Sequence, residues 1–328
     1  MKKLVRSREI LYIIPRGYRG TADAVHIVRT DREGIKMKYT RLGKTDLIVS
    51  RVSYGGIVSA GFYDHVSYPS EGQEASDRYV AWAVDHGVDY FDVAPGYGNA
   101  QDQLGISLEP YRRKVSLACK TQCRDREGAE KDLARSLKLL RTDHFDVYQL
   151  HAVSSMDDVE RSFAPGGVME LMGTLKKRGI ARYLGFTAHS EDAALRMLEL
   201  FPFDTVLFPY NWFMNMEHGM GNRLLKELDR RGVGKIGMKA LIERRWDPSE
   251  DRGPFPKSWC KPIDTAADPA FGRAAMDYAL SLGVETLIPP GNFPSFSFAV
   301  DQIDACEGKP DMDLLRARLV SVRGKEFF

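Results

Sequence analysis

The sequence predicts an α/β fold, a (β/α)8 TIM barrel with an N-terminal β-hairpin. From Val52 onward, a short apolar strand, a polar loop and an amphipathic helix recur in that order. Strands that alternate with helices pair in parallel through right-handed crossovers, and eight such units favour a closed barrel over an open sheet. No Gly-x-Gly-x-x-Gly segment follows the first strand, which argues against a Rossmann fold.

The expected strands are short apolar runs, namely Val52–Gly55, Tyr90–Val93, Val115–Lys120, Phe145–His151, Arg182–Thr187, Thr205–Tyr210, Lys235–Met238 and Thr286–Pro289. Between two of them, Leu133, Leu137 and Leu140 share one helical face. Such spacing predicts helices in Glu130–Leu140, Gly167–Lys177, Glu191–Leu200, Asn222–Arg231, Ala270–Leu282 and Phe296–Cys306. Several helices should end at a glycine, the usual C-terminal cap: Gly87, Gly179, Gly232 and Gly283.

The chain divides into an extension and one domain. Residues 1–36 show little periodicity, and the sequence does not decide whether this extension is ordered. Apolar and polar residues then alternate from Met37 about a turn at Gly43–Asp46, which predicts the hairpin. We expect residues 37–328 to form a single barrel domain with a C-terminal tail. The long loop Ile242–Ala267 follows the seventh strand, so it should lie over the C-terminal mouth of the barrel.

Composition narrows the class of protein. The 328 residues carry 47 basic and 45 acidic side chains, a balance that argues against a nucleic-acid-binding surface. Apolar runs are too short for a membrane span or a secretory signal, so we expect a cytoplasmic protein. No two of the four cysteines form a Cys-x-x-Cys pair, and we expect no metal site. The sequence gives no indication of the oligomeric state.

Four polar residues stand where catalytic groups lie in a barrel, at the C-terminal ends of strands. Asp92 ends the second strand, Tyr97 follows in the same loop, Lys120 ends the third strand and His151 ends the fourth. Each alone has a structural interpretation, such as a turn cap for Asp92 or a solvated Lys120. Their joint position on three consecutive strands favours one site.

These four residue types suit proton transfer to an oxygen atom. A tyrosine is a poor proton donor at neutral pH, and a nearby lysine lowers the pKa of its phenol. An aspartate holds the lysine charged and oriented, and a histidine beside Tyr97 can hydrogen-bond a substrate carbonyl. Carbonyl reduction with hydride from a cofactor needs these functions.

At these residues the sequence resembles the aldo-keto reductase family, from about Met37 to about Cys306. The segment YFDVAPGYG is similar to the family's Asp-x4-Tyr-Gly signature, and Lys120 and His151 match its other two catalytic positions. KIGMKAL resembles a Gly-Met-Lys motif of one branch, whose members often carry a cysteine-rich Fe–S tail that this chain lacks. The resemblance implies an NAD(P)H-dependent oxidoreductase that reduces a small aldehyde or ketone.

The resemblance also implies a nicotinamide cofactor, NADPH or NADH, across the barrel mouth. Its contacts would come from Gly55, Gly56, Asp92, Thr187, Ala188, Leu207, Met238, Lys239, Ala240, Leu241, Gly291 and Asn292. Lys239 would meet a phosphate, and Gly291 and Asn292 the adenosine side.

The chain departs from the family at several cofactor positions. Leu207 replaces a glutamine that binds the carboxamide, Met238 an aromatic ring and Ala240 a proline. PPGNFPSFSFAVDQ lacks the basic residues that grip a 2′-phosphate, and Asn99–Ala100–Gln101 replaces a Ser-Glu pair. The choice between NADPH and NADH therefore stays open.

Two other functions are compatible with the same predicted barrel. Lys120 could serve a Schiff-base lyase. The departures at the nicotinamide positions suit a non-catalytic nucleotide-binding barrel that acts as a sensor or partner subunit. The physiological substrate is not encoded in a recognisable motif, although the sequence offers Tyr63, Trp212 and Trp246 as apolar pocket candidates.

Overall fold

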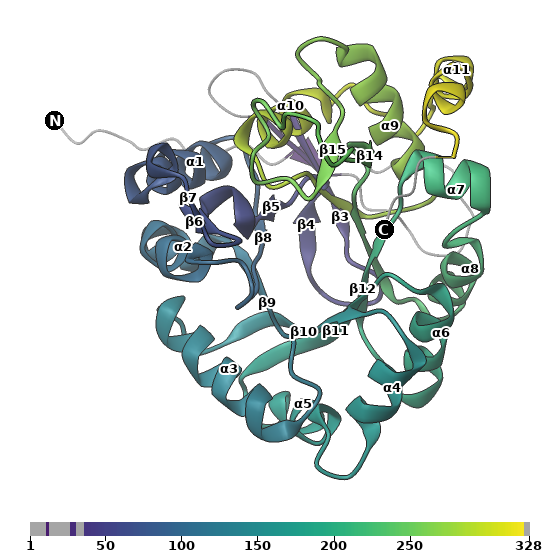
Figure 1. Ribbon diagram of the computed structural model, residues 1–328. Coiled ribbons are helices and arrows are strands. Elements are labelled where there is room, and N and C mark those ends of the chain that lie inside the picture. The colour runs from purple at the N-terminus through teal and green to yellow at the C-terminus, as the bar shows by residue number, and fades with distance from the viewer. Residues whose placement is uncertain (1–10, 13–26, 31–35, 325–328) are drawn as a thin grey trace, which may run out of the picture.

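The computed structural model describes residues 11–12, 27–30 and 36–324. Eight parallel strands form one sheet, in the order β16-β13-β12-β11-β10-β9-β8-β5 (Figure 1). A parallel bridge between Val52 and Leu287 joins its two edges, which confirms the predicted (β/α)8 TIM barrel. The barrel strands are β5 (Tyr54–Gly55), β8 (Tyr90–Asp92), β9 (Ser116–Thr121), β10 (Phe145–Val153), β11 (Ala181–Ala188), β12 (Thr205–Pro209), β13 (Gly234–Met238) and β16 (Thr286–Ile288).

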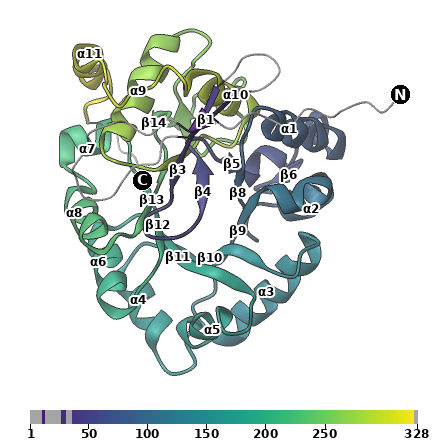
Figure 2. The same cartoon turned by 180° about the vertical axis from the view of Figure 1, so that it is seen from behind.

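Helices surround the barrel in both views (Figures 1 and 2). They are α1 (Gln73–Asp85), α2 (Ala100–Leu108), α3 (Arg126–Leu139), α4 (Met156–Phe163), α5 (Val168–Leu175), α6 (Glu191–Leu200), α7 (Trp212–His218), α8 (Asn222–Arg231), α9 (Pro269–Ser281), α10 (Phe293–Gln302) and α11 (Met312–Val322). Helix α10 begins three residues before its predicted start, because the Asn292 side chain accepts a hydrogen bond from Ser295 N at 2.8 Å and caps it. Among the residues that the structure describes, no helix combines the length and apolar character required to cross a membrane.

The predicted N-terminal hairpin consists of β3 (Lys36–Arg41) and β4 (Ile48–Ser50), which pair antiparallel. Leu42, Leu47 and Val49 are buried in one cluster with the barrel residues Tyr90 and Val147. The hairpin therefore fills the N-terminal end of the barrel. Two segments of the expected extension add strands to it, β1 (Leu11–Tyr12) and β2 (Ile27–Thr30), and β2 pairs with β3.

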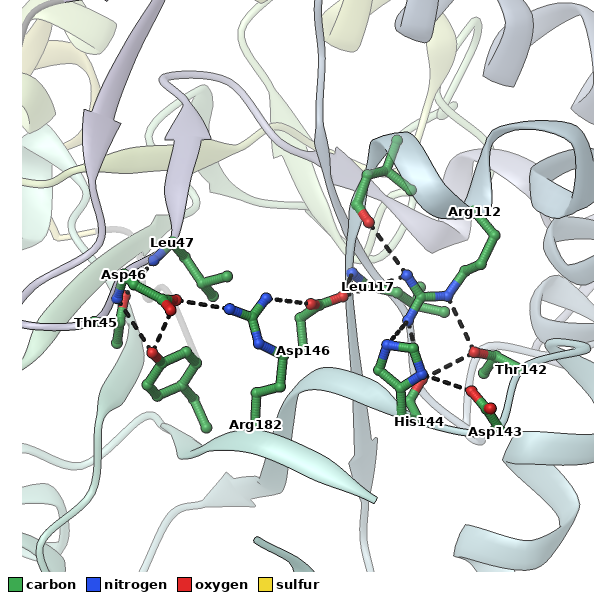
Figure 3. Close-up of polar contacts among 12 residues, drawn as sticks. Thr45, Asp46, Leu47, Arg112, Leu117, Thr142, Asp143, His144, Asp146 and Arg182 are labelled. Carbon is green, nitrogen blue, oxygen red and sulfur yellow. Dashed lines mark hydrogen bonds and ion pairs between the residues drawn. The ribbon is translucent and has the colours of Figure 1, made fainter. Parts of the chain in front are cut away.

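Ion pairs bind this hairpin to the barrel (Figure 3). Arg182, near the start of β11, contacts Asp46 of the hairpin turn at 2.7 Å and Asp146 of β10 at 2.9 Å. Asp146 also accepts hydrogen bonds from Leu117 N at 2.9 Å and Arg112 Nη1 at 3.3 Å. This network closes the end of the barrel opposite to the predicted site.

Two short hairpins follow barrel strands at the C-terminal mouth. One is formed by β6 (Phe62–Tyr63) and β7 (Val66–Ser67), which lie between the 3-10 helices η1 (Gly56–Ser59) and η2 (Pro69–Glu71). The other is formed by β14 (Ile242–Arg245) and β15 (Cys260–Pro262). We call the connection between β14 and β15, residues 246–259, the strap. A third 3-10 helix, η3 (Glu109–Lys114), leads from α2 toward β9.

The C-terminal tail packs beside the barrel wall. Leu315 and Val322 of α11 are buried in a cluster with Trp212 of α7, Phe271 of α9 and Ile242, where β14 begins. Trp212, a sequence candidate for the pocket, is therefore a core residue of this cluster, and its Nε1 donates to Ile242 O at 3.2 Å.

Candidate active site at the C-terminal mouth

The four predicted catalytic residues lie together at the C-terminal ends of consecutive strands. Asp92 ends β8, Lys120 is the second-last residue of β9, and His151 lies two residues before the end of β10. Tyr97 follows β8 in the loop that leads to α2. Parallel pairing of β8 with β9 and of β9 with β10 brings these strand ends to one rim.

A buried ion pair forms the base of the site. Lys120 Nζ contacts Asp92 Oδ1, and the side chains of these two residues are 0% and 3% exposed. Gln149 Nε2 donates a hydrogen bond to the other carboxylate oxygen, Asp92 Oδ2, at 2.7 Å. Both oxygens of Asp92 are thus engaged, which fixes the carboxylate and through it the ammonium group of Lys120.

Tyr97 and His151 lie above this pair. Lys120 Nζ is 5.3 Å from the centroid of the Tyr97 ring, and the rings of Tyr97 and His151 meet edge to face with centroids 5.7 Å apart. Burial raises the pKa of Tyr97, and the Lys120 charge only partly offsets this. From the nearby lysine alone, a lowered pKa of Tyr97 was expected, and the structure shows the opposite direction because burial outweighs the lysine charge.

Charge and burial also set the state of the two basic side chains. Burial alone would lower the pKa of Lys120, but Asp92 and Tyr97 outweigh it and raise the pKa above its ordinary value. Burial, together with the charge of Lys120, lowers the pKa of His151 well below its usual range. The site therefore holds a charged lysine and a neutral imidazole at neutral pH.

The residues after Tyr97, where the chain departs from the family's Ser-Glu pair, support the site. Asn99 Oδ1 accepts hydrogen bonds from Gly61 N at 3.0 Å and Phe62 N at 2.9 Å, so it holds the β6–β7 hairpin beside Tyr97. Gln101 Nε2 donates to Ser136 Oγ at 2.8 Å, between α2 and α3. The substitution therefore has a structural explanation, because the side-chain amides of Asn99 and Gln101 tie neighbouring elements to the loop and helix that follow Tyr97.

An apolar cleft of about 750 Å³, which includes its opening to solvent, lies over the site. Several predicted cofactor residues line it with Tyr97: Gly55, Asp92, Leu207, Met238, Lys239 and Gly291. Burial lowers the pKa of Lys239 to about 8. The strap contributes three further lining residues, Lys257, Ser258 and Trp259, and Cys260 at the start of β15 is a fourth. All four lie in the loop Ile242–Ala267, which the sequence places over the mouth, although no motif singles out these residues.

The other predicted cofactor residues do not line this cleft, and they are Gly56, Thr187, Ala188, Ala240, Leu241 and Asn292. The Thr187 hydroxyl accepts a hydrogen bond from Ala152 N at 2.7 Å. Asn292 is 4% exposed, and its amide donates to Ser258 Oγ at 3.2 Å while it caps α10. The hydrogen bond from Asn292 to Ser258 thus ties the strap to α10.

The lining of the cleft is chemically compatible with a nicotinamide nucleotide. Leu207, Met238 and Ile288 supply apolar surface suited to the face of a flat ring, and Lys239 supplies a cation for a phosphate. The Leu207 side chain offers no hydrogen-bonding atom, so a carboxamide would have to find its partner elsewhere.

Gln149 is the polar residue of the site that sequence reasoning missed. It lies two residues before His151 on the same strand, so both side chains point to the same face. A glutamine within a buried strand is itself unusual, and this was the available signal.

Comparisons with known proteins agree with this architecture. The model of the Aldo/keto reductase family matches residues 64–257, more than half of the chain. Aldo-keto reductase YhdN of Bacillus subtilis (strain 168) is 27% identical over 191 residues, which cover 54% of this chain and 55% of that protein. The uncharacterized oxidoreductase YqkF of the same organism is 26% identical over 166 residues, 46% of this chain and 49% of that protein. The matches thus span about half the length of these curated relatives.

Solved structures share the fold. The holo form of aldo-keto reductase AKR11C1 from Bacillus halodurans superposes with a TM-score of 0.64 at 18% identity, over 89% of this chain and 98% of that one. Glycerol dehydrogenase AKR11B4 from Gluconobacter oxydans gives a TM-score of 0.61 at 19% identity, over 87% and 94%. Fold and site define an α/β-barrel protein with a buried Asp–Lys pair, a tyrosine and a histidine at its mouth. With the family match, the chain belongs to the aldo/keto reductase family.

Proposed function

We propose that this protein catalyses the NAD(P)H-dependent reduction of an aldehyde or ketone to an alcohol, with Tyr97 as the proton donor. The observation that carries the proposal is the position of Tyr97, which faces the apolar cleft directly above the buried Asp92–Lys120 pair. Family membership and the relatives named as aldo-keto reductases support the same chemistry.

The chain's own residues supply the proton. The Tyr97 O–H donates to the carbonyl oxygen as negative charge develops there, and the raised pKa of Tyr97 keeps the phenol protonated beforehand. The ammonium group of Lys120 stabilises the phenolate that remains until solvent returns a proton. His151, neutral because its pKa is lowered, can orient the carbonyl oxygen without adding a second charge.

Leu207, Met238 and Ile288 would hold the nicotinamide ring, and Lys239 a phosphate. When bound, the reduced cofactor supplies the hydride that completes the reduction at the carbonyl carbon. Of the two cofactors we favour NADPH, and the test includes NADH.

The direct test follows the absorbance of NADPH, and separately of NADH, with a panel of aldehydes and ketones. We expect substrate-dependent oxidation of the cofactor, and Tyr97→Phe should lower kcat by about 100-fold or more with little change in cofactor affinity. Tyr90→Phe is the matched control, because the Tyr90 hydroxyl is buried without a hydrogen-bond partner among the described residues. Nucleotide binding without turnover on any carbonyl would contradict the reductase proposal and favour a binding role.

A further inference from the structure

The strand that carries His151 contains a β-bulge at this residue. The pairing of β10 with β11 shifts its register between Leu150 and Val153. Two residues of β10, His151 and Ala152, therefore lie opposite one residue of β11, Thr187. A bulge bends its strand locally and re-aims a side chain, so this one sets the direction in which the imidazole of His151 leaves the strand.

The bulge places Ala152 in a backbone conformation that alanine does not adopt by itself. Its φ is +55°, in the left-handed region. This region is unfavourable for a residue with a Cβ, and alanine has no polar side chain that could compensate by a local hydrogen bond. Such a conformation persists only where the surrounding structure enforces it. The contacts of Ala152 therefore identify what maintains the bulge.

Side chains of neighbouring segments hold both polar groups of the Ala152 backbone. The N–H of Ala152 donates to Thr187 Oγ1 at 2.7 Å, and its carbonyl oxygen accepts from Arg124 Nη2 at 2.9 Å. The hydroxyl of Ser154, an exposed residue, is a second donor to the same oxygen at 3.2 Å. The Arg124 side chain is only 8% exposed, so its contact is a buried, charge-assisted hydrogen bond and the stronger of the two.

The guanidinium group of Arg124 is itself fixed by two further acceptors. Its Nε donates to Asp158 Oδ1, in the first turn of α4, at 2.9 Å, and its Nη1 donates to Gln122 O at 3.1 Å. Asp158 also accepts from Ser154 N at 2.9 Å, in the turn that follows β10. One planar side chain thus joins the segment after β9, the bulge of β10 and the start of α4.

His151 depends on its backbone for its orientation. Its Nδ1 is buried and has no hydrogen-bond partner among the described residues, so no contact at that nitrogen turns the ring. We propose that Arg124 is a positioning residue for the reduction. By holding Ala152 in the left-handed conformation, it directs the imidazole of His151 toward Tyr97. This inference rests on the proposed function, in which His151 orients the carbonyl oxygen beside the proton donor.

The kinetic test follows the reduction of butanal by NADPH with the full-length protein. Arg124→Met should lower kcat by about tenfold and change the KM for NADPH by less than about twofold, because the imidazole loses its direction. Adding Ala152→Gly should raise kcat again by about fivefold, because glycine adopts the left-handed conformation without the guanidinium group. An unchanged kcat in Arg124→Met, or a loss that Ala152→Gly does not relieve, would overturn the proposal.

Two further variants separate geometry from charge and from general stability. Burial lowers the pKa of His151, and the charge of Arg124 contributes to this; Arg124→Lys keeps that charge but removes the planar fork that reaches three acceptors. It should lose about as much activity as Arg124→Met, and full activity would refute the positioning role. Arg112→Met is the matched control. The Arg112 side chain is 16% exposed and also donates to two backbone carbonyl oxygens, but at the opposite end of the barrel, so kcat should stay at the wild-type value.

An NMR measurement tests the position of His151 without turnover. The chain has seven histidines, so protein labelled with ¹³C only at histidine gives few ring signals, and His151→Gln assigns one of them. The wild-type protein should show a nuclear Overhauser effect between the rings of His151 and Tyr97, which meet edge to face. Arg124→Met should abolish this effect, and the added Ala152→Gly should restore it.

The two measurements distinguish this inference from the proposed function. If the wild-type protein reduces no carbonyl but the ring contact is lost in Arg124→Met and restored by Ala152→Gly, Arg124 positions His151 and only the reductase proposal fails. A ring contact that is absent from the wild-type protein, or unchanged in Arg124→Met, would refute the role of Arg124 whatever the activity.

Discussion

Gln149 donates a hydrogen bond from Nε2 to Asp92 Oδ2 at 2.7 Å, on the side of the carboxylate away from Lys120. Gln149 is 0% exposed, and its Oε1 has no hydrogen-bond partner among the described residues. A buried amide that leaves one end unsatisfied incurs a desolvation cost of about 1–3 kcal/mol. The contact thus adds to the proposed catalytic group a residue that holds the carboxylate of Asp92 in one orientation.

Replacement of this residue tests that positioning role. Gln149→Met keeps the volume and removes the donor, so Asp92 loses one of its two side-chain contacts. We expect kcat to fall by about tenfold, near 1.4 kcal/mol, with KM nearly unchanged, because Gln149 is buried and does not line the cleft. Steady-state kinetics separate the effect on kcat from the effect on KM. Gln149→Glu should also have low activity, because it places a second carboxylate against Asp92. A change confined to KM would argue against the assignment.

Loss of the lysine should damage stability as well as turnover. Lys120→Met leaves the buried Asp92 carboxylate without its counter-charge, and we expect the free energy of unfolding to fall by about 3–5 kcal/mol. Adding Asp92→Asn removes that uncompensated charge, so the double variant should be more stable than Lys120→Met alone. Urea denaturation measures the free energy of unfolding of the single and the double variant. Strictly additive losses would mean that the two side chains do not interact energetically.

Features set by the local sequence pattern could be predicted from the sequence, whereas features set by contacts between distant parts of the chain could not. The eight strands and the strand-end positions of Asp92, Lys120 and His151 were predictable, because they depend on local apolar periodicity and on parallel pairing. Trp259 and Lys257 were not, because their positions depend on contacts with η1 and the β6–β7 hairpin, roughly two hundred residues away in the chain. The direction of the Tyr97 pKa was missed because burial cannot be judged from a motif.

Acid should destabilise the fold through His189, which is partly buried. Burial lowers the pKa of His189 to about 4, whereas an imidazole in an unfolded chain titrates near pH 6.5. Below that pH the unfolded chain binds a proton that the folded protein does not, so the free energy of unfolding falls as pH falls. Between about pH 7.5 and about pH 5, His189 should contribute a loss of roughly 2 kcal/mol.

His189→Gln should remove this part of the pH dependence. Urea denaturation at the two pH values gives the difference directly, and the wild-type loss should exceed that of the variant by the predicted amount. His218→Gln is the matched control, because its side chain is exposed at the end of α7. The same loss in wild type and His189→Gln would show that this histidine is not the origin of the acid sensitivity.

The ion pairs at the N-terminal end of the barrel should differ strongly in their contribution to stability (Figure 3). Asp146 is buried and accepts from Leu117 N, Arg112 and Arg182. Asp146→Ala leaves the buried Leu117 N–H without its acceptor and Arg112, whose side chain is 16% exposed, without its counter-charge, so it should cost about 3–5 kcal/mol. Arg182 is 45% exposed, and Arg182→Ala should cost less than about 1 kcal/mol. Urea denaturation of the two variants measures the contrast. The network lies at the end of the barrel opposite to Tyr97, so Asp146→Ala protein that folds should keep the wild-type kcat. A comparable loss of stability in Asp146→Ala and Arg182→Ala would show that exposure does not decide the strength of these ion pairs.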